Sequence, residues 1–342
     1  MRGAGSGLVA VVTVAALAAV APLAGRAEAA PALERIASFA GPPPTAVAVS
    51  RGGRVFVAVP GRGLIEVRPD GQAPFPRRAG RRRVRVQGAT IDGQDRLWTV
   101  DRGAGREGAP VTALLALDLA RDRVRHRITL GAAIAGPARA LAHVRVDPRR
   151  GAEGVAYLAD VAERAAVVVI VVDLATGRAR RRRIEVPGAP RLQVTGLALS
   201  PDAALLHVGV TLAGEGHLLA VPTAGLVDPT RTDADLAVMV QDLGAAGVAA
   251  AVDADAAGRV YGATPGPPAA LERRLPGGPT EVLVVDPVLR GARALALADD
   301  GFLYVLAGAP RGPTGIYRVR VDAGRARDEP PVREAPIDPA IR

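Results

Sequence analysis

The sequence predicts an all-β protein, a six-bladed β-propeller, and three observations carry this prediction. One unit of sequence recurs six times, each copy has the pattern of a β-hairpin, and a third apolar strand follows most copies. Propeller blades are sheets of about four strands and roughly 40 to 50 residues. Because one blade cannot bury both of its faces, blades stack around a central channel. A long β-sandwich or two β domains is the alternative architecture for the same strands.

Each copy opens with a strand of small apolar residues that ends in Asp or Ser in most copies. A turn of Gly, Asp and Pro follows, and then a second strand that carries a ring side chain. The first strands are expected at residues 45–50, 87–92, 142–147, 195–200, 248–253 and 293–298. The ring side chains are Phe56, Trp98, Tyr157, His207, Tyr261 and Tyr304. Residues 33–39 are expected to add an outer strand that closes the ring, and residues 226–243 hold at most one short helix or a loop.

The composition excludes several classes of site. The chain has 342 residues, a formal net charge of +10 and no Cys, which excludes disulfides, thiolate metal sites and a Cys nucleophile. Every basic residue is Arg, and arginines cluster at residues 77–85 and 178–183. No aromatic stacking residues alternate with them and no DNA-binding motif is present. We therefore expect solvated strand ends and loops and no nucleic-acid partner.

The N-terminus predicts export. Arg2 precedes an apolar run at residues 8–23, and Ala27-Glu28-Ala29 places small residues where a signal peptidase cleaves. We expect a signal peptide at residues 1–29, with an uncleaved membrane anchor as the alternative. Residues 30–342 then form a single propeller domain with no membrane span, which we expect to be a monomer in the periplasm or secreted.

Residues 86–103 read VQGATIDGQDRLWTVDRG, and this string resembles one blade of the yellow/major royal jelly protein family. Weaker matches extend the resemblance over residues 33–322. The family is similar in architecture to the gluconolactonase group of six-bladed propellers, and its members are extracellular or exported. Some insect members act in pigment chemistry, some bind small amines, and bacterial ones are often labelled as related to dopachrome tautomerase. The fold alone therefore does not define the function.

The resemblance also implies where a site would lie. In such propellers the first residues of the innermost strands point into the channel mouth, where lactonase relatives hold a divalent cation with carboxylate and Asn oxygens. The equivalent first positions here are expected to be Thr45, Gln87, Ala142, Thr195, Val248 and Arg293. The next positions are Ala46, Gly88, His143, Gly196, Ala249 and Ala294. Because this ring has no carboxylate, we predict no bound metal and no cofactor.

Six residues are candidates for ligand binding at the channel mouth: Gln87, His143, Thr195, Arg293, Asp101 and Asp160. The two acids follow the strands of Trp98 and Tyr157, where a carboxylate could act as a general base or bind an amine. Asp also accepts hydrogen bonds from backbone amides at strand ends, and we favour this turn-capping role for both.

Three functions fit these residues. The favoured one is a non-enzymatic module that binds a small polar or anionic molecule at the channel mouth without metal chemistry. The second is an enzyme, either a lactonase or an isomerase similar to dopachrome tautomerase. The third is a scaffold whose Arg-rich loops bind a protein or an acidic envelope polymer.

Overall fold

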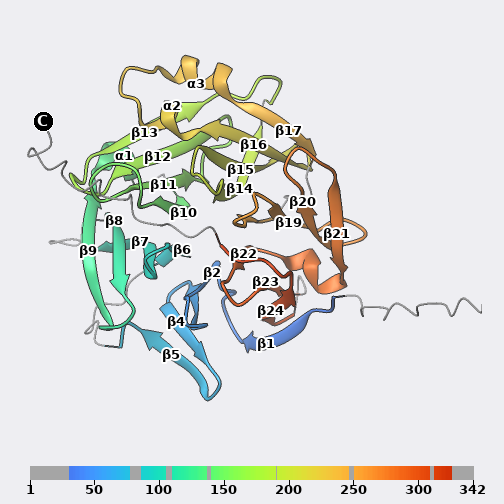
Figure 1. Cartoon of the computed structure of the whole chain (residues 1–342). Helices are drawn as coiled ribbons and strands as arrows, with labels where there is room; N and C mark the ends of the chain where they lie inside the picture. The colour runs from blue at the N-terminus through green and yellow to red at the C-terminus, as the bar shows by residue number, and fades with distance from the viewer. Residues whose placement is uncertain are drawn as a thin grey trace, which may run out of the picture. The chain divides into compact units, whose positions relative to one another are not determined.

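The computed structural model describes residues 31–77, 86–104, 110–136, 140–189, 191–245, 250–308 and 312–325. Six antiparallel sheets of four strands each make up these residues, arranged as the blades of a six-bladed β-propeller (Figure 1). The predicted all-β fold and the number of blades are confirmed. The expected signal peptide and most of the Arg cluster at residues 77–85 lie outside the described residues.

The first three blades follow one another along the chain, and each runs from its innermost to its outermost strand. Blade 1 comprises β2 (Ala46–Val49), β3 (Val55–Val59), β4 (Gly63–Arg68) and β5 (Gly71–Phe75). Blade 2 comprises β6 (Val86–Ile91), β7 (Arg96–Ala104), β8 (Pro110–Asp118) and β9 (Arg123–Leu130). Blade 3 comprises β10 (Leu141–Asp147), β11 (Val155–Asp160), β12 (Val167–Asp173) and β13 (Ala179–Ile184), after the short helix α1 (Ala132–Ala135).

The remaining blades carry the other helical segments. Blade 4 comprises β14 (Leu192–Leu199), β15 (Leu205–Leu212), β16 (Glu215–Pro222) and β17 (Gln241–Ala245), with α2 (Thr223–Val227) and α3 (Asp233–Met239) before its last strand. Blade 5 comprises β18 (Val252–Ala254), β19 (Val260–Thr264), β20 (Ala270–Arg274) and β21 (Thr280–Val285), followed by the 3₁₀ turn η2 (Pro287–Gly291). Blade 6 comprises β22 (Ala294–Leu297), β23 (Phe302–Gly308), β24 (Thr314–Arg320) and β1 (Glu34–Phe39).

The ring closes at both its inner and its outer edge. Each innermost strand contacts the next in the order β2, β6, β10, β14, β18 and β22, and β22 contacts β2 again. On the outside, β1 pairs antiparallel with β24, so the N-terminal strand completes the last blade as predicted. Arg318 of β24 donates to Glu34 of β1 at 2.8 Å across this closure.

Buried small side chains hold neighbouring blades together. A separate hydrophobic cluster lies at each of the interfaces between adjacent blades. The ring side chains of the repeat, His207 included, are all buried in the sheets. The interface between blades 4 and 5 has the smallest cluster, whose buried members are Ala198, Leu218, Val252 and Val260. The seam, meaning this interface between blades 4 and 5, is therefore stabilised by less buried apolar surface than the other blade interfaces.

A polar module explains why Asp and an aromatic ring recur together. Asp92 ends the first strand of blade 2 and accepts hydrogen bonds from the amides of Gln94 and Arg96 in the turn. The Trp98 indole nitrogen donates to the same carboxylate at 2.7 Å, and the Arg96 guanidinium also pairs with it at 2.7 Å. A strand end, a tight turn and the next strand are thereby joined through one buried carboxylate.

The same module corrects the alignment of the fifth repeat. In blade 5 the carboxylate that accepts from the Arg259 amide and from the Tyr261 hydroxyl is Asp255, not Asp253. The first strand of this repeat is therefore displaced by two residues from the expected range 248–253. Its channel positions become Ala250 and Ala251, while Val248 and Ala249 lie outside the described residues. A run of Ala and Val before two closely spaced Asp residues does not define a unique register.

The second Arg cluster is also more structured than expected. Residues 179–184 form β13, the outer strand of blade 3, so they are not a solvated loop. Arg182 is 7% exposed and donates to the carbonyl oxygens of Leu226, Asp228 and Arg231. It thereby anchors the segment of α2 and α3, where the sequence indicated at most one short helix. No helix within the described residues is long and apolar enough to cross a membrane.

Candidate functional site

The channel has two mouths, defined here by the direction of the innermost strands. The N-terminal mouth lies where these strands begin, and the C-terminal mouth lies where they end. With the register of blade 5 corrected, the first positions at the N-terminal mouth are Thr45, Gln87, Ala142, Thr195, Ala250 and Arg293. Their equivalence is supported by the backbone, because the amides of Thr45, Ala250 and Arg293 each donate to the second strand of their own blade.

The predicted polar residues differ in their surroundings at this mouth. Gln87 is half-buried, and its Oε1 atom is buried without a hydrogen-bond partner among the described residues. Thr195 is 8% exposed, whereas the Arg293 residue is exposed to solvent. A buried amide oxygen without a partner loses the hydrogen bonds it would make in water, so it favours a donor in its vicinity.

Three neighbouring blades carry an irregularity at the same level of the innermost strand. The pairing register shifts between Gln87 and Ala89 in blade 2, and between Ala142 and Arg145 in blade 3. It shifts again between Val194 and Gly196 in blade 4. These β-bulges leave Gly88, His143 and Thr195 outside the regular ladder. Bulges of this kind redirect side chains and are frequent beside binding sites.

His143 breaks the pattern of the second ring position. The other blades have Ala46, Gly88, Gly196, Ala251 and Ala294 there, all of them small. The close approach of neighbouring backbones requires small residues, since a Cβ atom added to Gly88 would lie 3.0 Å from the His143 amide nitrogen. His143 itself adopts a left-handed backbone conformation, with φ of 52°. For a residue with a Cβ atom this conformation costs about 1 kcal/mol or more, and such strain concentrates at functional sites.

The surroundings of His143 keep its imidazole neutral. Burial lowers its pKa from 6.5 to about 4, and the charge of Arg145 acts in the same direction. A neutral imidazole has one nitrogen that donates and one that accepts a hydrogen bond. The ring can therefore recognise a polar ligand near pH 7 without bringing a charge into the channel.

The two predicted acids make structural contacts. The Asp160 carboxylate accepts hydrogen bonds from the amides of Ala140 at 3.1 Å and Ala162 at 3.2 Å, as expected for turn capping. Asp101 is 5% exposed and forms a 3.0 Å ion pair with Arg127 of β9, the outer strand of its own blade. These contacts account for both carboxylates without assigning them a ligand.

The N-terminal mouth does not fit a divalent cation. Its first two ring positions contribute Gln, Thr, His and Arg side chains, with Ala and Gly at the rest, and no carboxylate. Across the described residues no group of three or more His, Asp or Glu side chains is placed to hold a metal ion. A hard cation requires several oxygen ligands, usually with negative charge, and this donor set does not supply them.

The C-terminal mouth holds a cavity that sequence reasoning did not predict. Its volume is about 100 Å³, and residues from all six blades line it. Arg145 of β10 and Asp253 of β18 lie in its wall and form a 3.3 Å ion pair from blade 3 to blade 5. The other Asp253 oxygen accepts a hydrogen bond from the Leu297 amide of blade 6 at 2.8 Å. The sequence predicts Asp253 at the end of a first strand, and no sequence pattern indicates its contacts with Arg145 and Leu297.

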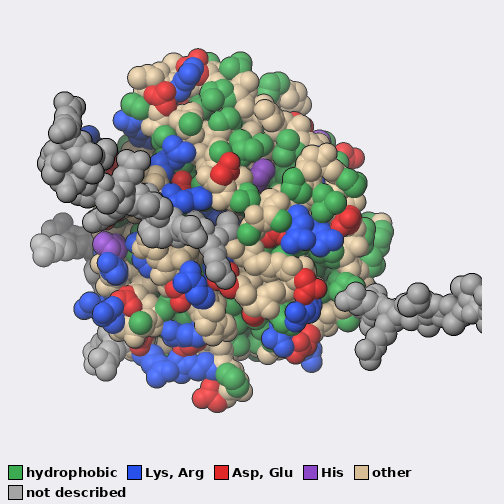
Figure 2. All heavy atoms as spheres, in the orientation of Figure 1, with side chains coloured by type: hydrophobic (Ala, Val, Ile, Leu, Met, Phe, Trp, Pro, Cys, Tyr) green, Lys and Arg blue, Asp and Glu red, His purple; other side chains and the backbone are tan. Residues whose placement is uncertain are grey.

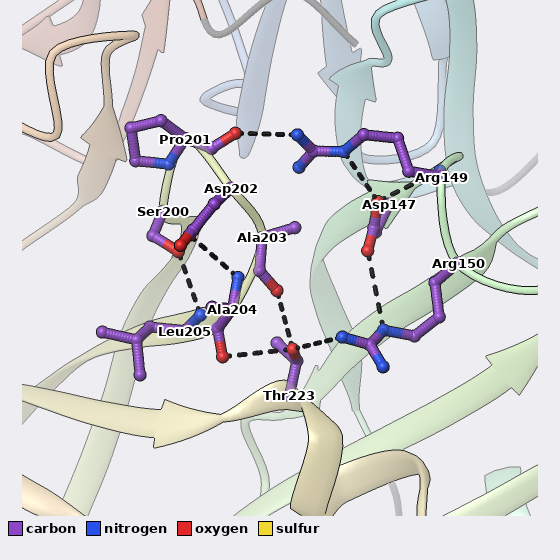
Figure 3. Close-up of polar contacts among 10 residues, drawn as sticks. All are labelled: Asp147, Arg149, Arg150, Ser200, Pro201, Asp202, Ala203, Ala204, Leu205 and Thr223. Atoms are coloured by element: carbon purple, nitrogen blue, oxygen red, sulfur yellow. Dashed lines mark hydrogen bonds and ion pairs between the residues drawn. The ribbon is translucent and has the colours of Figure 1, made fainter. Parts of the chain in front are cut away.

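One wall of the cavity is fixed by contacts between blades 3 and 4 (Figure 3). Arg149 and Arg150 both approach the buried carboxylate of Asp147, at 3.3 and 3.7 Å. From there the Arg149 guanidinium reaches the Pro201 carbonyl at 2.9 Å, and Arg150 reaches the Thr223 hydroxyl at 3.0 Å. The two turns at this mouth are thereby held together, and Arg149 stays at the cavity wall.

The six four-stranded sheets define the class of protein, a six-bladed β-propeller. Within the chain, residues 84–186 match the family model for major royal jelly protein. This match covers the string that first indicated the family and confirms the predicted resemblance there. No curated protein matches the sequence.

Solved structures share the propeller fold at low sequence identity. A gluconolactonase from Xanthomonas campestris has a TM-score of 0.57 and 15% identity, over 85% of this chain and 89% of that one. A luciferin-regenerating enzyme has a TM-score of 0.56 and 12% identity, over 86% and 97% of the two chains. A putative glucose dehydrogenase from Thermus thermophilus has a TM-score of 0.52 and 18% identity, over 84% and 99%. At such identities the likeness establishes the fold and leaves the activity open.

Proposed function

We propose that this protein is an exported, non-enzymatic binding module that holds a small polar or anionic molecule at the N-terminal mouth without a metal ion. The observation that carries the proposal is His143. It is the one large side chain at a ring position where the other blades have Gly or Ala, and it adopts a left-handed conformation. The other described residues with a Cβ atom and a positive φ lie in turns or bends, whereas His143 lies within a strand. Strain at such a position favours a role beyond folding.

The neighbouring groups favour a ligand with a hydrogen-bond donor. The buried Gln87 Oε1 accepts from no described residue, and the neutral His143 ring offers a donor and an acceptor. Gly88 lies between them, against the His143 backbone. The exposed Arg293 would attract an anionic part of the ligand from solvent. A small molecule with hydroxyl or amine groups and a carboxylate matches this set.

The test is a ligand screen by thermal shift with small carboxylates, amines and phenols, followed by titration calorimetry on each hit. We expect the variants His143→Gly and Gln87→Ala to weaken binding at least tenfold, which is about 1.4 kcal/mol. His143→Gly should fold normally because Gly adopts the same φ without strain. His126→Ala, on the outer strand β9, is the matched control and should bind as the wild type does. Unchanged affinity in both channel variants would contradict the proposal.

Metal content and turnover test the non-enzymatic part. We expect mass spectrometry of the purified protein, dialysed against calcium, to find no stoichiometric divalent ion. We also expect no turnover on a panel of lactones and tautomerase substrates. One tightly bound ion per chain, or turnover that His143→Gly abolishes, would favour the enzyme hypothesis instead.

Export and the scaffold hypothesis have their own tests. We expect the mature protein to begin at Ala30, which N-terminal sequencing of protein from the periplasm or medium would check.

In the face of the molecule shown in Figure 2, basic and acidic side chains are interspersed. Such a mixture does not favour a polyanion partner for this face, and binding to an acidic polymer that weakens steeply with salt would contradict this.

A further inference from the structure

We propose that the cavity at the C-terminal mouth is a second binding site, for a small oxyanion of carboxylate or phosphate chemistry. This site is distinct from the His143 site at the opposite mouth, so either can exist without the other. The argument rests on which charged groups around the cavity are still accessible.

Most carboxylates of the lining already have their hydrogen bonds. The Asp92 side chain has no exposed surface and accepts from Arg96 and Trp98. Asp253 is 15% exposed, and its oxygens accept from Arg145, Ala254 and Leu297. These two carboxylates therefore contribute little free acceptor or negative surface to the cavity.

The accessible charges are mainly guanidinium groups. Arg51, Arg149 and Arg325 line the cavity with side chains 58%, 27% and 19% exposed. Asp299 is the one lining carboxylate with a comparable exposure, 30%. Arg149 already pairs with Asp147, so Arg51 and Arg325 are the cations that Asp299 must balance. Two cations against one carboxylate favour a negatively charged ligand, and guanidinium groups suit planar or tetrahedral oxyanions.

Asp299 occupies the position that such an anion would take. Its carboxylate lies 3.3 Å from the Arg325 guanidinium and 3.8 Å from that of Arg51. Two cations thus share one carboxylate, and Arg51 is held mainly by its 2.7 Å hydrogen bond to the Gly93 carbonyl of blade 2 rather than by Asp299. The Arg51 guanidinium keeps this hydrogen bond when its contact with Asp299 is replaced. A free carboxylate or phosphate could therefore bind beside Asp299, or replace that contact, without leaving any buried charge unpaired.

The backbone beyond β24 supplies one of the two arginines. The Val321 amide donates to Gly301, and the Gly324 carbonyl accepts from the Ala256 amide of blade 5 at 2.9 Å. These bonds place Arg325 at the mouth, where it also reaches the Ile91 carbonyl of blade 2 at 3.2 Å. Three blades therefore fix this guanidinium, and a preorganised cation costs little entropy when an anion binds.

The experiment is titration calorimetry of the full chain with inorganic phosphate and with citrate at low ionic strength. We expect Arg51→Gln and Arg325→Gln to weaken binding at least tenfold, and Arg121→Gln, an exposed arginine on a distant turn, to have no effect. Asp299→Asn should tighten binding severalfold because it removes the competing carboxylate. A misfolded variant could not produce that gain.

The outcomes separate this site from the other mouth. A preference for citrate or for phosphate identifies the physiological ligand as a carboxylate or a phosphate compound, and both support the site. Absence of binding in the wild type and in Asp299→Asn would overturn the proposal. So would equal weakening by Arg121→Gln, which would indicate a general charge effect. If His143→Gly alone abolished anion binding, the anion would belong to the N-terminal mouth.

Discussion

Arg145 and Asp253 form a 3.3 Å ion pair across the channel, joining the innermost strands of blades 3 and 5 and bypassing blade 4. Their side chains are 16% and 15% exposed, so both charges are largely removed from solvent. Arg145 is two residues from His143 on the same strand. The pair therefore lies in the wall of the cavity at the C-terminal mouth, close along β10 to the His143 site, and it links blades 3 and 5.

Asp253→Asn should destabilise the protein by about 2 to 3 kcal/mol, because it leaves the Arg145 guanidinium partly buried without its counterion. Urea denaturation would measure the loss. Asp322→Asn removes the partner of Arg320 in a pair whose side chains are 65% and 69% exposed, and should cost less than about 0.5 kcal/mol. Equal effects of the two variants would show that the Arg145–Asp253 pair is no more than a surface contact.

The repeated units predicted the fold because each blade needs a similar contact between the end of its first strand and its second strand. Asp92 with Trp98, and Asp255 with Tyr261, use one carboxylate to join a strand end to the next strand. Because the blades need contacts of this kind, an Asp or Ser and a ring side chain recur at similar spacing in most copies even where the rest of the sequence differs. The predicted alignment of the fifth repeat was wrong by two residues, because the small Ala and Val residues around Asp253 fit either alignment equally well.

The candidate site was only partly predictable. Comparison of equivalent positions identified His143, since a large residue at a position of Gly and Ala is visible in the sequence. The Arg145–Asp253 pair was not, because the two residues are 108 positions apart and nothing local couples them. The burial of Arg182 was likewise not predicted, because a run of arginines does not show which side chain donates to backbone carbonyl groups.

Gly196→Ala should destabilise the seam between blades 4 and 5. A Cβ atom there would lie 2.6 Å from Val252 Cγ1 and 2.8 Å from the Val252 amide nitrogen, so a backbone must move. We expect a loss of about 2 kcal/mol in urea denaturation. Gly131→Ala is the control, because a Cβ atom there meets nothing within 4 Å and its φ is −62°. A neutral Gly196→Ala would mean that the seam can widen freely.

Stability should fall with acid in a window set by His143. Its pKa is about 4 in the folded protein and 6.5 when unfolded, so below pH 6.5 the unfolded chain takes up a proton that the folded one does not. The loss grows as pH falls from 6.5 to 4 and reaches at most about 3 kcal/mol. His143→Gly should remove most of this slope, while His207, whose pKa burial also lowers, supplies the rest. Identical slopes in the two proteins would contradict the assignment.

Arg182→Leu should detach the segment of α2 and α3 from blade 3. The guanidinium donates to the carbonyls of Leu226, Asp228 and Arg231, and without it these acceptors lose their charged donor. We expect a destabilisation of about 2 to 4 kcal/mol, with faster proteolysis confined to residues 223–239. Arg180→Leu, an exposed position on the same strand, is the matched control and should leave both measurements unchanged. Uniformly faster proteolysis across the chain would instead show that Arg182 supports the whole blade rather than this segment.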